Sequence, residues 1–201
     1  AANPADTSPL RLDEEIRSID QALQQTEFRD QFRLEQHWAV RVNDLQSLLL
    51  RHQPYLVHFS GHGSAASEII LQNDAGESQP VSTHELKKLF ALLKDNIRCV
   101  FLNACYSEIQ AAAIAEEIDC VIGMSNAIGD QAAIRFASAF YQALGYGRDV
   151  KTAFELGRLQ IDLDNLEQEN IPQLLAIRAD PAQVSFRAQA EKEEQTNDRE
   201  H

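Results

Sequence analysis

Long apolar runs are missing from this chain of 201 residues, and so is any excess of basic residues. No apolar stretch approaches the roughly 20 residues that a helix needs to cross a bilayer, which argues against a membrane-spanning protein. The 18 Lys and Arg residues are outnumbered by 31 Asp and Glu residues, and the net charge is -13. Because phosphate contacts need clustered basic side chains, this composition argues against nucleic-acid binding.

Cysteines are few as well. Only Cys99, Cys105 and Cys120 occur, and no two of them form a CxxC pair, which argues against a disulfide framework and against a structural zinc site. Cys99 and Cys120 each begin an apolar run, where a free cysteine usually behaves as a small buried side chain. Residues 1–9 lack the basic and apolar segments of a secretory signal, so we expect a cytoplasmic protein.

The length and the hydrophobic share of 44% suit one globular domain with a core of its own. We expect this domain over residues 1–186. Residues 187–201 are dominated by charged and polar side chains and are expected to form a disordered tail. Because Ala1 and Ala2 resemble the end of a strand whose beginning is absent, the chain is expected to be a piece of a longer protein.

Segments that predict helices alternate with segments that predict strands. Helical spacing of apolar residues marks the helices, and short apolar runs bounded by turn residues mark the strands. Helices are predicted over 10–27, 83–96, 109–117, 130–145 and 149–162 and after a cap at Asn43, and strands over 33–42, 55–59, 69–71, 99–103 and 120–123. This alternation predicts a three-layer α/β/α fold with a mostly parallel central sheet and with sites at the carboxyl ends of the strands.

Two residues suited to acyl transfer each follow a predicted strand. His62 lies between Gly61 and Gly63, which permit tight turns and let a substrate approach the backbone closely. Cys105 lies between a strand and a helix, whose dipole favours a thiolate. A cysteine peptidase needs such a nucleophile, an imidazole that moves protons, and oxyanion donors. The N–H groups of Gly63 and Cys105 are the candidate donors.

The segments HFSGHG at 58–63 and LNACYS at 102–107 closely resemble the two motifs of the CHAT branch of the caspase and separase families, and the resemblance extends to about residue 157. It implies a caspase-like fold and a thiol protease without a cofactor, in which His62 is the acid and base and Cys105 the nucleophile. It also implies a protein or peptide substrate, and a parent chain in which repeat, ATPase or sensor modules control the peptidase in signalling or defence.

A weaker resemblance concerns substrate recognition. The segment 123–136 is similar to the separase segment that contributes an acid to the pocket for an arginine side chain. Asp130 would be that acid, which implies cleavage after a basic residue, although the residues at 124–127 depart from the separase pattern. An ordinary acid in the first turn of a helix is the alternative interpretation of Asp130.

Three other interpretations compete with a peptidase. The domain could be a catalytically silent protein-interaction module, against which the intact His62 and Cys105 argue. A flavodoxin-like or receiver-like domain shares the sheet, but the sequence lacks a phosphate loop and an acidic cluster at the strand ends. A metal site built from His58, His62 and His84 is disfavoured, because no HExxH motif and no neighbouring carboxylate accompany them.

Overall fold

A computed structural model of the chain describes residues 1–186, and the predicted charged tail at 187–201 lies outside the described residues. The described part contains helices α1 (Leu12–Gln24), α2 (Val42–His52), α3 (Thr83–Leu93), α4 (Glu108–Ala115), α5 (Asp130–Gly145) and α6 (Val150–Leu163), strands β1 (Leu56–Ser60), β2 (Ile69–Gln72), β3 (Ser78–Val81), β4 (Cys99–Asn103), β5 (Cys120–Met124) and β6 (Pro172–Leu175), and short 3-10 turns at Arg29–Gln31 and Pro181–Gln183.

Four of the strands form the central sheet, in the order β1-β4-β5-β6, while β2 and β3 form a separate hairpin. β1, β4 and β5 run parallel, and β6 pairs antiparallel with β5. The predicted mostly parallel sheet is therefore confirmed. β6 was not predicted, because it has only four residues and begins with a proline, a pattern that is typical of an edge strand.

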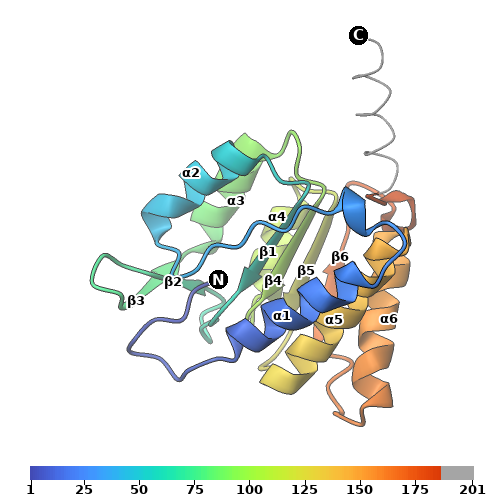
Figure 1. Cartoon of the computed structure of the whole chain (residues 1–201). Helices are drawn as coiled ribbons and strands as arrows, with labels where there is room; N and C mark the ends of the chain where they lie inside the picture. Colours follow the sequence, from blue (N-terminus) through green and yellow to red (C-terminus); the bar gives the residue numbers. More distant parts are fainter. Residues whose placement is uncertain (187–201) are drawn as a thin grey trace.

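Helices cover both faces of the sheet (Figure 1). α1, α5 and α6 lie on one face, and α2, α3 and α4 lie on the other. Every residue of β4 and β5 is buried, which explains why these strands consist of continuous apolar runs. Cys99 and Cys120 are paired in register in the middle of this core, so the prediction that both are structural is confirmed. With helices on both faces of the sheet, the predicted three-layer α/β/α arrangement is confirmed.

Two local predictions around residue 40 are wrong. Residues 33–42 form no strand and make only an isolated bridge between Arg41 and Gln72, because Ala39 adopts a left-handed backbone conformation (φ 53°). The cap of α2 is Arg41 rather than Asn43, and the carboxylate of Asp44 accepts a hydrogen bond from the backbone N–H of Arg41 at 3.1 Å.

The start of α3 follows the prediction. Ser82 accepts a hydrogen bond from the backbone N–H of Glu85 (3.3 Å), and the carboxylate of Glu85 accepts one from the backbone N–H of Ser82 (2.9 Å). This reciprocal capping box satisfies two helix-terminal donors. Across residues 1–186, no helix combines the length and the apolarity that a membrane crossing requires.

Candidate active site

The carboxyl ends of β1 and β4 bring the two predicted catalytic loops together. Ser60 pairs with Asn103 at the end of the parallel register. His62 lies two residues beyond β1, and Cys105 lies two residues beyond β4. Because the two strands end at the same edge of the sheet, both residues leave the sheet on the same side.

The two loops touch at Gly63 and Cys105. A Cβ atom placed on Gly63 would lie 1.8 Å from the carbonyl oxygen of Cys105 and 3.1 Å from its backbone nitrogen. No side chain larger than hydrogen fits at that distance, so glycine at position 63 is a condition for the contact. Gly63, which was expected to permit a turn, therefore lets the loop of His62 pack against the loop of Cys105.

One ring nitrogen of His62 is held by a backbone group. Nε2 lies 2.9 Å from the carbonyl oxygen of Ser8, in the segment that precedes α1. A carbonyl only accepts, so in the neutral imidazole Nε2 carries the proton and Nδ1 keeps its lone pair. Ser8 thus fixes the tautomer that can act as a base. The sequence identified no third residue of a possible triad, and the contact with Ser8 could not be predicted because a backbone carbonyl has no signature in residue type.

Cys105 is half-buried, and its Sγ lies 3.9 Å from the carbonyl oxygen of Ile128. Tyr106, with φ at 58°, and Ser107 separate it from the first residue of α4, so Cys105 precedes the helix rather than starting it.

The thiols of the other two cysteines are buried in the sheet. Burial, and next the neighbouring Asp119, raises the pKa of Cys120 to about 12. Burial, and next Cys120, raises the pKa of Cys99 well above its usual range.

The two candidate oxyanion donors are unoccupied. In the part of the chain that the structure describes, the backbone N–H groups of Gly63 and Cys105 have no hydrogen-bond acceptor. The residues on either side of Gly63 are bonded to the start of β2 and the residue before it, since Ile70 donates to the carbonyl of His62 (3.0 Å) and Ser64 donates to that of Glu68 (2.8 Å). The backbone around the donor is therefore held in place by other bonds.

A small pocket opens beside Cys105, where α1, the ends of β1 and β4, and the start of α5 meet. Asp130 is the first residue of α5, and its half-buried carboxylate has no ion-pair or hydrogen-bond partner within residues 1–186. Other side chains in the wall include Glu15, Ser60, Asn103 and Ile128. The structure thus brings three of the predicted site residues to one edge of the sheet: His62, Cys105 and Asp130.

The sequence matches the CHAT domain family over residues 4–183. The chain belongs to this family. One relative, named Roc-COR-CHAT protease and from an unknown prokaryotic organism, is 26% identical over 156 residues, which cover 74% of this chain and 15% of that protein. Another, a probable protease of Gillisia limnaea (strain DSM 15749 / LMG 21470 / R-8282), is 27% identical over 154 residues, which cover 75% of this chain and 27% of that protein. This CHAT domain therefore spans about a quarter or less of each relative.

The wall of the CHAT domain pocket contains a buried acid that sequence reasoning missed. Only 5% of Glu15 is exposed, and its carboxylate accepts hydrogen bonds from Asn103 Nδ2 (2.6 Å) and from the hydroxyl of Ser60. His58 Nε2 lies 3.1 Å from the same carboxylate, and His58 Nδ1 lies 3.0 Å from the hydroxyl of Tyr141. The acid in the first turn of α1 thus ties that helix to the ends of β1 and β4.

This network determines the charge of Glu15. Burial alone would raise the pKa of Glu15, but the hydrogen bond and charge of His58, and then the hydrogen bonds of Ser60 and Asn103, outweigh burial and lower it. The carboxylate therefore stays ionised inside the fold. Because His58 is committed to Glu15 and Tyr141 while His62 contacts Ser8, the histidines of the HFSGHG motif serve two separate sets of contacts.

Proposed function

We propose that this CHAT domain is a cysteine endopeptidase in which Cys105 is the nucleophile and His62 the acid and base. The observation that supports the proposal is the backbone contact between Gly63 and Cys105, next to two N–H groups that donate to no acceptor within the described residues. The family and the protease names of its relatives support peptidase chemistry. No bound cofactor is needed for this mechanism.

In the first half of the reaction, Nδ1 of His62 takes the proton from Sγ of Cys105, and the thiolate attacks the carbonyl carbon of the scissile bond. The N–H groups of Gly63 and Cys105 donate to the resulting oxyanion. The imidazolium returns its proton to the leaving amine as the C–N bond breaks, which leaves a thioester on Cys105. Water, deprotonated by His62, then attacks the thioester and releases the acid product and the thiol.

We further propose that the pocket beside Cys105 takes a basic side chain on the acyl side of the scissile bond. Asp130 is an unpaired carboxylate in the wall of that pocket, and a Lys or Arg side chain would give it a cationic partner. Hydrolysis of peptide libraries tests this point. Asp130→Asn should reduce kcat/KM for Arg and Lys substrates by about tenfold or more, the size of one charge-assisted contact, while leaving apolar substrates unchanged. Unaltered selectivity would remove Asp130 from substrate recognition.

The proposal assigns the peptidase to residues 1–186 and its control to other modules of a longer, cytoplasmic parent chain. The small share of each relative that the chain covers supports such a parent. A silent interaction module is the alternative, and hydrolysis separates the two. A peptide substrate should be cleaved by the chain and by Cys120→Ala, but not by Cys105→Ala. Equal turnover by Cys105→Ala and the unaltered chain would contradict the assignment of the nucleophile.

A further inference from the structure

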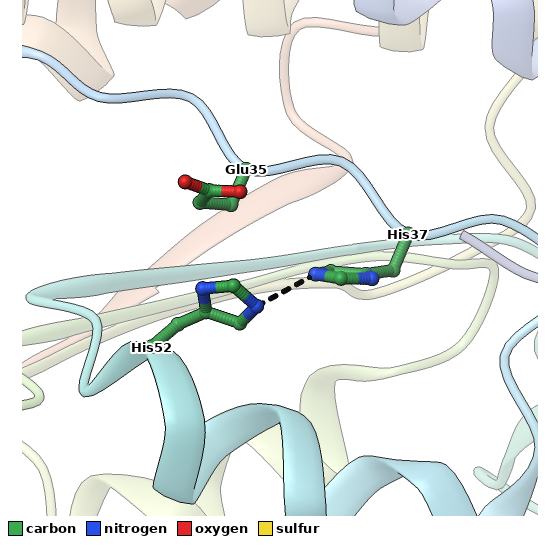
Figure 2. A group of neighbouring side chains, drawn as sticks. All are labelled: Glu35, His37 and His52. Carbon is green, nitrogen blue, oxygen red and sulfur yellow. Dashed lines mark hydrogen bonds between the residues drawn. The ribbon is translucent and has the colours of Figure 1, made fainter.

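Three side chains with metal-ligating atoms converge on the side of the molecule where α2 ends (Figure 2). Glu35 and His37 come from the segment between the first 3-10 turn and α2, and His52 is the last residue of α2. One ligating atom from each residue lies within 4.8 Å of those of the other two. None of the three belongs to the pocket beside Cys105.

The two imidazoles have an unusual mutual geometry. Their Nε2 atoms lie 3.0 Å apart, and the ring centroids lie 4.9 Å apart at an interplanar angle of 47°. Two neutral rings can share one proton at this distance only if they adopt opposite tautomers. A divalent ion bound to both rings at about 2.0–2.1 Å in tetrahedral geometry would hold the two nitrogens at about 3.3 Å. The nitrogens would therefore separate by only a few tenths of an ångström, while the rings turn so that both lone pairs face the ion.

The backbone on which these ligands lie is partly fixed. The backbone nitrogen of Ala1 donates to the carbonyl of His37 at 2.7 Å. His37 and His52 are half-buried, whereas Glu35 is exposed and forms an ion pair with Arg33, Nε to Oε1, at 2.5 Å. Because an exposed pair of this kind contributes little to stability, Glu35 can leave Arg33 for a metal.

We propose that Glu35, His37 and His52 form a binding site for a divalent transition metal. Two imidazoles and one carboxylate are a ligand set that suits Zn²⁺ rather than Ca²⁺ or Mg²⁺, which prefer oxygen ligands alone. The exposure of Glu35 leaves a fourth position open to water. No metal site was expected from the sequence, because these two histidines are fifteen residues apart and follow no spacing rule.

A bound metal would have a structural consequence. The three ligands lie in the wall of a large groove that runs between β1 and the segment 31–38, with α1 at its other side. Joining His37 to His52 would tie that segment to the end of α2 and so hold the groove wall in place. The metal would act without touching His62 or Cys105, and peptide hydrolysis in the presence of a chelator should persist.

Isothermal titration with Zn²⁺ alone, on the chain freed of metal by chelation, tests the proposal. We expect one ion per chain, and we expect His37→Ala or His52→Ala to weaken binding by at least tenfold. His84→Ala, which removes an exposed histidine of α3, is the matched control and should bind as the unaltered chain does. Co²⁺ in place of Zn²⁺ should give visible absorption bands that both variants lose.

Circular dichroism of each variant establishes that it is folded before its titration is compared. The proposal is overturned if the folded chain binds no Zn²⁺, because His37 and His52 are then only a hydrogen-bonded pair. Binding that survives both His37→Ala and His52→Ala, or that falls equally in His84→Ala, also overturns it. Glu35→Gln should weaken binding less than either histidine variant, since both imidazole ligands remain.

Discussion

His58 and His62 lie four residues apart in one motif, and the structure gives them opposite surroundings. His58 has partners near both ring nitrogens, with Nε2 at 3.1 Å from the carboxylate of Glu15 and Nδ1 at 3.0 Å from the hydroxyl of Tyr141, and its ring stacks on Phe101 with centroids 4.4 Å apart. His62 is half-buried and has one nitrogen engaged, by the carbonyl of Ser8. A general base needs a nitrogen with a free lone pair.

We propose that this difference separates a structural histidine, His58, from a catalytic one, His62. His58 links α1, β1 and α5, so its replacement should lower the stability of the fold. His62 lies on the loop that contacts Cys105, so its replacement should lower the rate of peptide hydrolysis. The three cysteines divide in the same way, since Cys105 is half-buried beside a pocket while Cys99 and Cys120 are buried in the sheet.

The largest expected effect tests this division directly. His62→Ala should lower kcat/KM for a peptide substrate by about 1000-fold, because the proton transfer is lost, and it should leave the midpoint of thermal unfolding nearly unchanged. His58→Ala should lower the midpoint, because the carboxylate of Glu15 loses its partner in the core. Steady-state kinetics and calorimetry on both variants measure the two effects. Equal loss of activity and equal loss of stability in the two variants would break the comparison.

Gly63→Ala should have the next largest effect. Its Cβ would collide with the carbonyl of Cys105, so the two loops must separate, and the oxyanion loses a donor. We expect kcat to fall by about 100-fold, with a smaller change in KM. Gly76→Ala is the control, because that glycine has a positive φ but open space around its Cα. If both variants keep full activity, the loop contact has no role in the reaction.

The buried acid should give a pH-dependent effect on stability. Glu15 has a lowered pKa in the folded chain, so the stability it contributes is present above the unfolded pKa, near 4.5, and is lost as the pH falls through the folded value. Glu15→Gln should cost about 3 kcal/mol at neutral pH, because His58 loses its buried anion. Denaturant titrations between pH 3 and pH 7 should show a flatter acid limb for the variant. A parallel acid limb would mean that Glu15 is not ionised in the fold.

The smallest effect concerns the order in which iodoacetamide alkylates the three cysteines. In the folded chain, Cys105 should be alkylated first, while Cys99 and Cys120 should react only after unfolding, since burial raises the pKa of both thiols and hides them. Mass spectrometry after short exposures measures the order. Alkylation of Cys120 at the same rate as Cys105 would contradict the buried environment of β5.

The sequence predicted those parts of the molecule whose local pattern and tertiary role agree. β4 and β5 are buried on both faces, so their apolar runs could be recognised without knowing their neighbours. The capping box at Ser82 is a local signal and gave the start of α3 correctly. His62, Cys105 and Asp130 were predicted with the help of motif resemblance, and their catalytic and binding roles stay predictions, although the fold brings the three residues to one edge of the sheet.

The parts that could not be predicted depend on contacts between distant residues. Glu15 is 45 residues from Ser60 and 88 from Asn103, and as a residue type it is indistinguishable from the other acids of its turn. The apolar run of Trp38, Ala39 and Val40 favoured a strand over 33–42. Pairing with a neighbour decides whether a strand forms, however, and within residues 1–186 this segment makes only one bridge. The role of Ser8 rests on a carbonyl that every residue possesses.

Covalent labelling with an electrophilic peptide that ends in Arg tests the central claim most directly. The probe reacts with a thiol that is activated by a base and placed beside a basic-residue pocket. Our account predicts a single adduct on Cys105, its loss in Cys105→Ala and in folded His62→Ala, and its retention in Cys120→Ala. An adduct on Cys105 that forms equally fast without His62, or an adduct on another residue, would contradict the assignment of His62 and Cys105 as a catalytic pair.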